Sequence, residues 1–169
     1  MSVSRDALQQ GLQPWLPPLP PVQPAEGTPP AAAPAVAAPS GAAPAKPANL
    51  LDVTVAPDQL VAVAEYLSAQ SFAMDTITGV DWLAAGKMEV VYDFFHFASP
   101  VHVVVRTRVP REQAEVPTIS GVFPGANWHE RETHEFFGIR FLGHPDLSPL
   151  LLPEDATYHP LRKDFAGAA

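Results

Sequence analysis

Cysteine is absent from all 169 residues of the chain. Disulfides, thiolate-ligated zinc and cysteine-ligated iron–sulfur clusters all need the cysteine thiol, so none of them can form within this chain. The sequence also lacks an apolar run of the ~18–20 residues that a membrane-spanning helix requires. Its first residues carry no apolar core of the kind found in secretory signals. These absences predict a cytoplasmic chain with no iron–sulfur cluster of its own.

Positive charge is scarce. The net charge is −8, and after residue 49 there are 16 Asp and Glu residues against 8 Lys and Arg. A phosphate backbone is bound by clustered cations, so this balance argues against a nucleic-acid partner. Arg106, Arg108 and Arg111 form one small basic group, which we interpret as the solvated end of a strand. No glycine-rich nucleotide loop and no nucleophile elbow occurs in the sequence.

Proline divides the chain into unequal parts. Twelve of its 21 prolines lie between Gln13 and Ala48, mixed with alanine. Such a segment has too few large apolar side chains to offset the entropy lost on ordering. We therefore predict a disordered leader over residues 1–48, a folded domain over 49–142 and an extended tail over 143–169. The PxxP spacing around Pro17–Pro21 is typical of a docking peptide, but no Arg or Lys flanks it to orient such a ligand. We therefore favour a semi-rigid spacer and keep the docking peptide as the alternative.

Periodicity predicts an α+β fold for the domain. Apolar residues at helical spacing indicate a helix from about Pro57 to Ala69. Alternating Val, Phe and Tyr residues predict strands over Phe72–Trp82, Lys87–Phe97 and Val101–Val109. The short turn between the last two allows only an antiparallel connection. The expected fold class is an antiparallel sheet flanked by helices.

A second helix is predicted from about Trp128 to Phe137. Asn127 and Glu130 have capping-box spacing at its start, and Gly138 is a natural stop. Spacing of four residues along this helix also permits surface ion pairs between Glu130 and His134 and between Arg131 and Glu135.

Histidines are the residues here most suggestive of catalysis. His129 and His134 are five residues apart, so they point about 140° away from each other around the helix and cannot share a zinc ion. His144 and His159 each precede proline and lie near Asp146 and Asp155. Such a pair more often locks a loop than catalyses a reaction, because a catalytic site needs a nucleophile, a base and an orienting group.

The C-terminal segment is apolar and yet aperiodic. Four prolines recur between Pro145 and Pro160, which excludes a long helix and a central strand. The segment is nevertheless rich in leucine, so we expect it to lie on its own domain or on a partner.

Several separated motifs in this last third resemble the C subunit of respiratory complex I, the proton-pumping NADH:quinone oxidoreductase, and its relatives among membrane-bound hydrogenases. The motifs are Glu130-Arg131-Glu132 with Glu135-Phe136-Phe137, then Gly143-His144-Pro145-Asp146-Leu147, then Pro153-Glu154-Asp155, and finally His159-Pro160-Leu161-Arg162-Lys163-Asp164-Phe165. The family commonly has Arg after the GHPDL element, where this chain has Ser148-Pro149. That variant looks like relatives that take electrons from donors other than NADH.

The resemblance implies a structural subunit of the peripheral arm that has no redox centre. Its partners would be a large hydrogenase-like subunit, which forms part of the quinone pocket, and iron–sulfur subunits; FMN, the Fe–S clusters and quinone would all sit in those partners. The chain would be peripheral to the cytoplasmic face of the cell membrane, with no catalytic, cofactor-binding or metal residue. The residues expected at the partner interface are Glu130, Arg131, Glu132, Glu135, Phe136, Phe137, His144, Pro145, Asp146, His159, Arg162, Lys163 and Asp164.

Three alternatives remain open at this point. Within the family, the chain could belong to a membrane-bound [NiFe] hydrogenase or a deazaflavin-oxidising dehydrogenase. Outside it, the chain could be a stand-alone hydrolase that uses His144 or His159, or an adaptor that binds through Pro17–Pro21.

Overall fold

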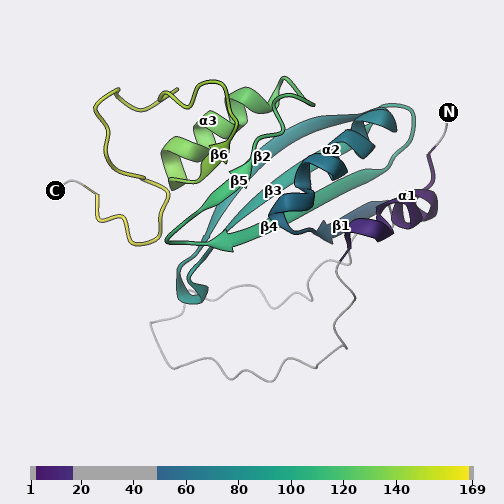
Figure 1. Ribbon diagram of the computed structural model, residues 1–169, viewed down its shortest axis with the longest axis horizontal. Helices are drawn as coiled ribbons and strands as arrows, with labels where there is room; N and C mark the ends of the chain where they lie inside the picture. Colours follow the sequence, from purple (N-terminus) through teal and green to yellow (C-terminus); the bar gives the residue numbers. More distant parts are fainter. Residues whose placement is uncertain (1–2, 17–48, 168–169) are drawn as a thin grey trace, which may run out of the picture.

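A four-stranded sheet forms the centre of the molecule (Figure 1). The computed structural model describes residues 3–16 and 49–167. The strands, in chain order, are β1 (Leu50–Thr54), β2 (Phe72–Trp82), β3 (Lys87–His96) and β4 (His102–Pro110). Their order across the sheet is β1-β4-β3-β2. Neighbouring strands from β2 to β4 are antiparallel, whereas β1 runs parallel to β4.

The predicted antiparallel strands are confirmed to within one residue at each end. One face of the sheet is covered, and strand alternation places Tyr92, Phe94, Val103 and Val105 there, all at most 1% exposed. Arg106 and Arg108 point to the opposite face, as their positions in the alternating pattern predict. The α+β fold class expected from the sequence is therefore correct.

The helix predicted from Pro57 is present as a 3-10 turn over Pro57–Gln59 followed by α2 (Leu60–Ala69). Its apolar stripe is buried, with Leu60, Val63 and Leu67 at most 1% exposed. Figure 1 shows α2 lying across the covered face of the sheet. The stripe thus closes the main core over the central strands.

Helix α3 (Ala126–Phe137) is also present, but it begins differently from the prediction. Its N-cap residue is Gly125, and the expected capping box between Asn127 and Glu130 does not form. Glu130 lies on the buried side of the helix and binds residues outside it. The end is as predicted: Gly138 adopts a left-handed conformation with φ of 72°.

The prediction of disorder for the whole of residues 1–48 is wrong at its beginning. Residues Arg5–Leu12 form α1, and Ser4 caps it by accepting a hydrogen bond from the Ala7 amide. Leu8 and Leu12 are at most 1% exposed in the core. Leu8 and Leu12 are four residues apart, which is a helical spacing. The disorder prediction rested on the prolines that follow Gln13 and should not have been extended to these residues. The candidate docking peptide Pro17–Pro21 lies outside the described residues, as does the rest of the leader to residue 48.

Periodicity predicts no strand over residues 50–54 or 140–142, and around residues 116–119 it leaves open only a short strand or a turn. β1 has five residues, and β5 (Glu115–Pro117) and β6 (Arg140–Leu142) have three each and pair in parallel. Three residues are too few to show an alternating pattern, so their pairing is decided by tertiary contacts. After β6, the described chain to Gly167 contains turns and bends without helix or strand. Within the described ranges, no helix combines the length and apolar character needed to cross a membrane.

Candidate functional site

Helix α3 is the element on which the sequence motifs meet. Its core-facing residues are Ala126, Glu130 and Thr133, each at most 3% exposed. A second row, Arg131 and Glu135, faces the C-terminal tail and binds its backbone. The motif that suggested a partner-binding helix is therefore divided between the core and the tail.

Glu135 fastens the leucine-rich part of the tail. Its carboxylate accepts hydrogen bonds from three successive backbone amides: Leu150 at 2.8 Å, Leu151 at 3.0 and 3.1 Å to the two oxygens, and Leu152 at 3.2 Å. Bonds to a charged acceptor are stronger than neutral ones, and these satisfy amides that belong to neither helix nor strand. The tail backbone is thus held against the helix.

Arg131 binds the preceding turn of the tail. Its guanidinium donates to the carbonyls of Ser148 and Pro149, both at 3.0 Å, and to the Ser148 hydroxyl at 3.2 Å. Asp146 accepts from the Ser148 amide at 2.9 Å, and hydrogen bonds from Ser148 lower the pKa of this carboxyl. Ser148 and Pro149, the residues that depart from the family pattern, are therefore the ones that Arg131 binds in this turn.

Both candidate catalytic histidines form hydrogen bonds with backbone groups. The Nδ1 atom of His144 accepts from the Asp146 amide at 3.1 Å, so Nε2 carries the proton and donates to the Asn127 carbonyl at 3.2 Å. Nδ1 of His159 donates to the Glu135 carbonyl at 2.8 Å. The side chain of His144 is fully buried. These contacts match the loop-locking interpretation and leave the hydrolase alternative without an accessible base at His144.

The end of the tail is fastened to the sheet. Arg162 Nε donates to the Phe137 carbonyl at 2.6 Å, and the Lys163 amide donates to Asp81 at 2.9 Å. Arg111 bridges Asp81 at 3.0 Å and Asp164 at 2.6 Å. Burial alone would raise the pKa of Asp81, but the bonds from Arg111 and the Lys163 amide outweigh it and lower that pKa.

Asp81 and Arg111 were not among the predicted site residues. Arg111 was interpreted as part of a solvated strand end, whereas its side chain is only 12% exposed and joins the sheet to the tail. The sequence held one indication of this role. Asp81 lies an even number of positions after the buried Ile77 and Gly79 along β2, so its side chain points to the same covered face. A carboxylate on a covered face requires a partner.

Glu130 is a fully buried carboxyl group whose pKa is strongly shifted. It is 0% exposed and accepts hydrogen bonds from the Ile119 amide at 2.8 Å and from the Thr118 hydroxyl. Burial raises its pKa to about 7, although these two bonds oppose the rise. Nε2 of His144 stands 3.8 Å from the carboxylate. Burial and, secondarily, the charge of Glu130 also raise the pKa of Tyr92.

The two ion pairs that helical spacing permits within α3 do not form, because these side chains have other partners. Glu130 binds the Thr118–Ile119 loop rather than His134, and Arg131 and Glu135 both bind the tail rather than each other. Nδ1 of His134 donates to the Ile139 carbonyl at 2.9 Å and so holds the chain just after the helix. Spacing along a helix shows only which side chains can meet, and here the Thr118–Ile119 loop and the tail supply the partners instead.

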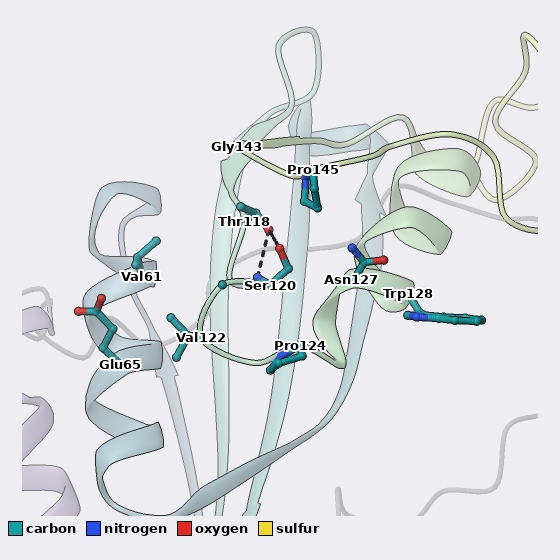
Figure 2. Close-up of a pocket in the computed structure, with 11 residues that line it drawn as sticks. Val61, Glu65, Thr118, Ser120, Val122, Pro124, Asn127, Trp128, Gly143 and Pro145 are labelled. Atoms are coloured by element: carbon teal, nitrogen blue, oxygen red, sulfur yellow. Dashed lines mark hydrogen bonds between the residues drawn. The ribbon is translucent and has the colours of Figure 1, made fainter.

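An open cavity of about 710 Å³ lies between α2 and α3 (Figure 2). Figure 2 shows Val61 and Glu65 on α2 at one side, Asn127 on α3 at the other, and the loop carrying Thr118 and Ser120 between them. Thr118 and Ser120 bond to each other at 2.8 Å. Among the described residues, no three His, Asp or Glu side chains gather closely enough to hold a metal ion.

Comparison with known proteins decides the family. The family model described as "Respiratory-chain NADH dehydrogenase, 30 Kd subunit" matches residues 53–169. The chain belongs to this family. The match begins inside β1 and includes α3 and the whole tail, whereas α1 lies outside it.

Relatives of the 30 kDa subunit family come from several kinds of complex. The C subunit of NADH-quinone oxidoreductase from Roseiflexus sp. strain RS-1 is 40% identical over 119 residues, which cover 68% of this chain and 68% of the relative. The C subunit of F(420)H(2) dehydrogenase from Methanosarcina mazei is 40% identical over 116 residues, covering 67% and 73%. A chain in the structure of a membrane-bound sulfane sulfur reductase, an archaeal respiratory membrane complex, superimposes with a TM-score of 0.66 at 30% identity, covering 72% and 75%.

Proposed function

We propose that this chain is a non-redox structural subunit of the peripheral arm of a proton-pumping NADH:quinone oxidoreductase, and that it docks on the large quinone-pocket subunit. One observation carries the docking role. The tail backbone is fastened to α3 and the sheet, yet apolar side chains along it stay exposed, with Leu151 64%, Tyr158 44% and Leu161 53% accessible. Family membership supplies the kind of assembly.

A fastened tail suits docking for an energetic reason. A flexible segment loses conformational entropy when it binds, and this loss subtracts from the affinity. Here Glu135 and Arg131 hold the backbone before any partner arrives, so the exposed side chains are already in position. Apolar groups exposed on a rigid surface are typical of the buried centre of a protein interface.

Within this proposal, most of the predicted interface residues do not contact the partner themselves. Most of them, such as Glu135, His159 and Arg162, position the tail through contacts inside the chain. They would act on the partner indirectly, by shaping the surface that it meets. FMN, Fe–S clusters and quinone would belong to the partner subunits, and the chain would reach the cytoplasmic face of the membrane only through them.

A second candidate is the equivalent subunit of a complex with another electron donor. The F(420)H(2) dehydrogenase relative is as similar, at 40% identity, as the Roseiflexus relative. The Ser148-Pro149 turn bound by Arg131 is the local feature that departs from the common family pattern. The identity of the donor-oxidising subunit in the assembled complex separates the two candidates.

Purification of the tagged chain from its native membranes in mild detergent, followed by mass spectrometry, tests the proposal. Recovery of a hydrogenase-like large subunit with iron–sulfur subunits is the expected result. An NADH-binding flavoprotein in the same preparation would establish the first candidate, and an F420-oxidising subunit the second. Recovery of the chain alone would contradict both.

A matched pair of variants tests the tail surface. Leu151→Ser with Tyr158→Ser removes two exposed apolar side chains, so the isolated fold should stay intact while the large subunit is lost from the purified complex. Leu83→Ser is the control, because Leu83 is a comparably exposed residue, at 42%, in the turn after β2. Equal recovery of the large subunit with both variants would refute docking through the tail.

A further inference from the structure

Strand β2 is an edge of the sheet, and it is long for an edge. Its 11 residues pair with β3 on one side, and no described strand pairs with the other. Unpaired backbone groups on an edge strand are a template for a further strand. The opposite edge, β1, has only five residues and lies beside α1 (Figure 1). The two edges of the sheet are therefore not equivalent.

Helix α3 runs alongside β2 and forms a wall. A methyl group added to Gly125, before the helix, would lie 3.7 Å from Met74, and one added to Gly79 would meet Phe137 at the end of the helix. The helix therefore follows β2 from about residue 74 to residue 79. A third row of α3 side chains, His129, Glu132 and Phe136, has the i, i+3, i+7 spacing of a single helix face.

A cavity of about 210 Å³ lies between this wall and the strand. It is lined by Thr76, Ile77, Thr78 and Gly79 of the strand, by Leu161 of the tail, and by His129, Glu132, Thr133, Phe136 and Phe137 of the helix. Alternate residues of a strand point to opposite faces, so four consecutive residues can line one cavity only through the backbone edge. The groove thus exposes main-chain groups on one side and a helix face on the other.

Charge indicates what the groove would accept. Glu132 is exposed in the groove, and no Lys or Arg is among the described residues that line it. Asp75, also exposed, lies on β2 at the irregularity in the pairing between Met74 and Thr76, directly before the groove residue Thr76. Two carboxylates along an edge in a chain of net charge −8 favour a segment that carries Lys or Arg.

We propose that the groove between β2 and α3, lined by Thr76–Gly79, His129, Glu132 and Phe136, binds an extended basic segment of another subunit as a fifth strand of the sheet. Main-chain hydrogen bonds to β2 would hold it, as in other cases of strand addition. A Lys or Arg would face Glu132, and an apolar residue would face Phe136 and Leu161. This inference rests on the proposed function, since it names the way in which a partner subunit attaches.

Site-directed crosslinking can locate the segment, because the chain has no native cysteine. Thr78→Cys, carrying a benzophenone maleimide, places the probe on the groove, and Thr54→Cys is the control, being an exposed threonine on the other edge strand. In the complex purified from native membranes, Thr78→Cys should crosslink at least about tenfold more to a Lys- or Arg-containing segment of another subunit than the control does. The proposal would be overturned if Thr78→Cys crosslinked only within this chain or to a second copy of it. It would also be overturned if Thr54→Cys gave the same crosslink at equal yield.

Charge reversal provides an independent test. Glu132→Lys should leave the isolated domain folded and weaken retention of the partner subunit about tenfold, with the remaining binding less sensitive to salt. Glu112→Lys, at an exposed position in the turn after β4, is the matched control and should change retention less than twofold. Equal effects of both variants would contradict the groove. If the wild-type chain recovers no partner subunit at all, the proposed function fails instead.

Discussion

Replacing Glu135 with alanine tests whether the tail is held by this carboxylate. The side chain is 5% exposed and accepts bonds from the amides of Leu150, Leu151 and Leu152. Hydrogen bonds to a charged group contribute about 1.5–3 kcal/mol each when buried, but these amides lie near the surface and can bind water once released. We therefore expect the variant to lower the free energy of local opening by about 3 kcal/mol in total.

Amide hydrogen exchange measures that opening directly. A change of about 3 kcal/mol corresponds to roughly 100-fold faster exchange at Leu150–Leu152. The amide of Leu161 bonds to the Phe136 carbonyl at 3.1 Å, independently of the Glu135 carboxylate, so its exchange should change less than about threefold. Glu132→Ala, on the exposed side of the same helix, should leave both regions unchanged.

Two results would refute this reasoning. If exchange at Leu150–Leu152 is the same in Glu135→Ala and the wild type, the carboxylate does not hold the tail. If exchange rises equally throughout the domain, Glu135 supports the global fold and not the local attachment.

Three further changes test other parts of the structure. Burial raises the pKa of Glu130 from 4.5 to about 7, so the folded chain holds a proton between these pH values that the unfolded chain has lost; the free energy of unfolding should therefore fall, by about 3 kcal/mol, as pH rises through this range. Glu130→Gln should remove most of this difference between urea unfolding at pH 5 and at pH 8. The same pH dependence in the variant and the wild type would contradict the assignment. Gly79→Ala would bring a methyl group within 2.5 Å of Phe137 and should cost about 1–3 kcal/mol in a thermal melt, whereas Gly121→Ala meets nothing and should not. Leu12→Ala, at a position 0% exposed, should cost about 2–5 kcal/mol of unfolding free energy, and no change would mean that α1 does not belong to the core.

The sequence by itself determined the elements whose side chains follow a local period. Alternation along Lys87–His96 and His102–Pro110 predicts strands because each residue's face depends only on its position in the strand. The stripe of α2 and the glycine that ends α3 follow from equally local rules. The family resemblance was also readable, because its motifs occur in order along the chain and match the family model over residues 53–169.

Tertiary structure alone decided where the charged side chains of α3 go. Periodicity shows that Glu130 and Glu135 lie on a helix, but their partners are the Thr118–Ile119 loop and the amides of Leu150–Leu152. Those partners are 11 to 17 residues distant in sequence and are brought close only by folding. The attachment of α1 to the core is decided in the same way. Burying a carboxylate is unfavourable unless the fold places hydrogen-bond donors beside it, and the local sequence does not show which donors these are.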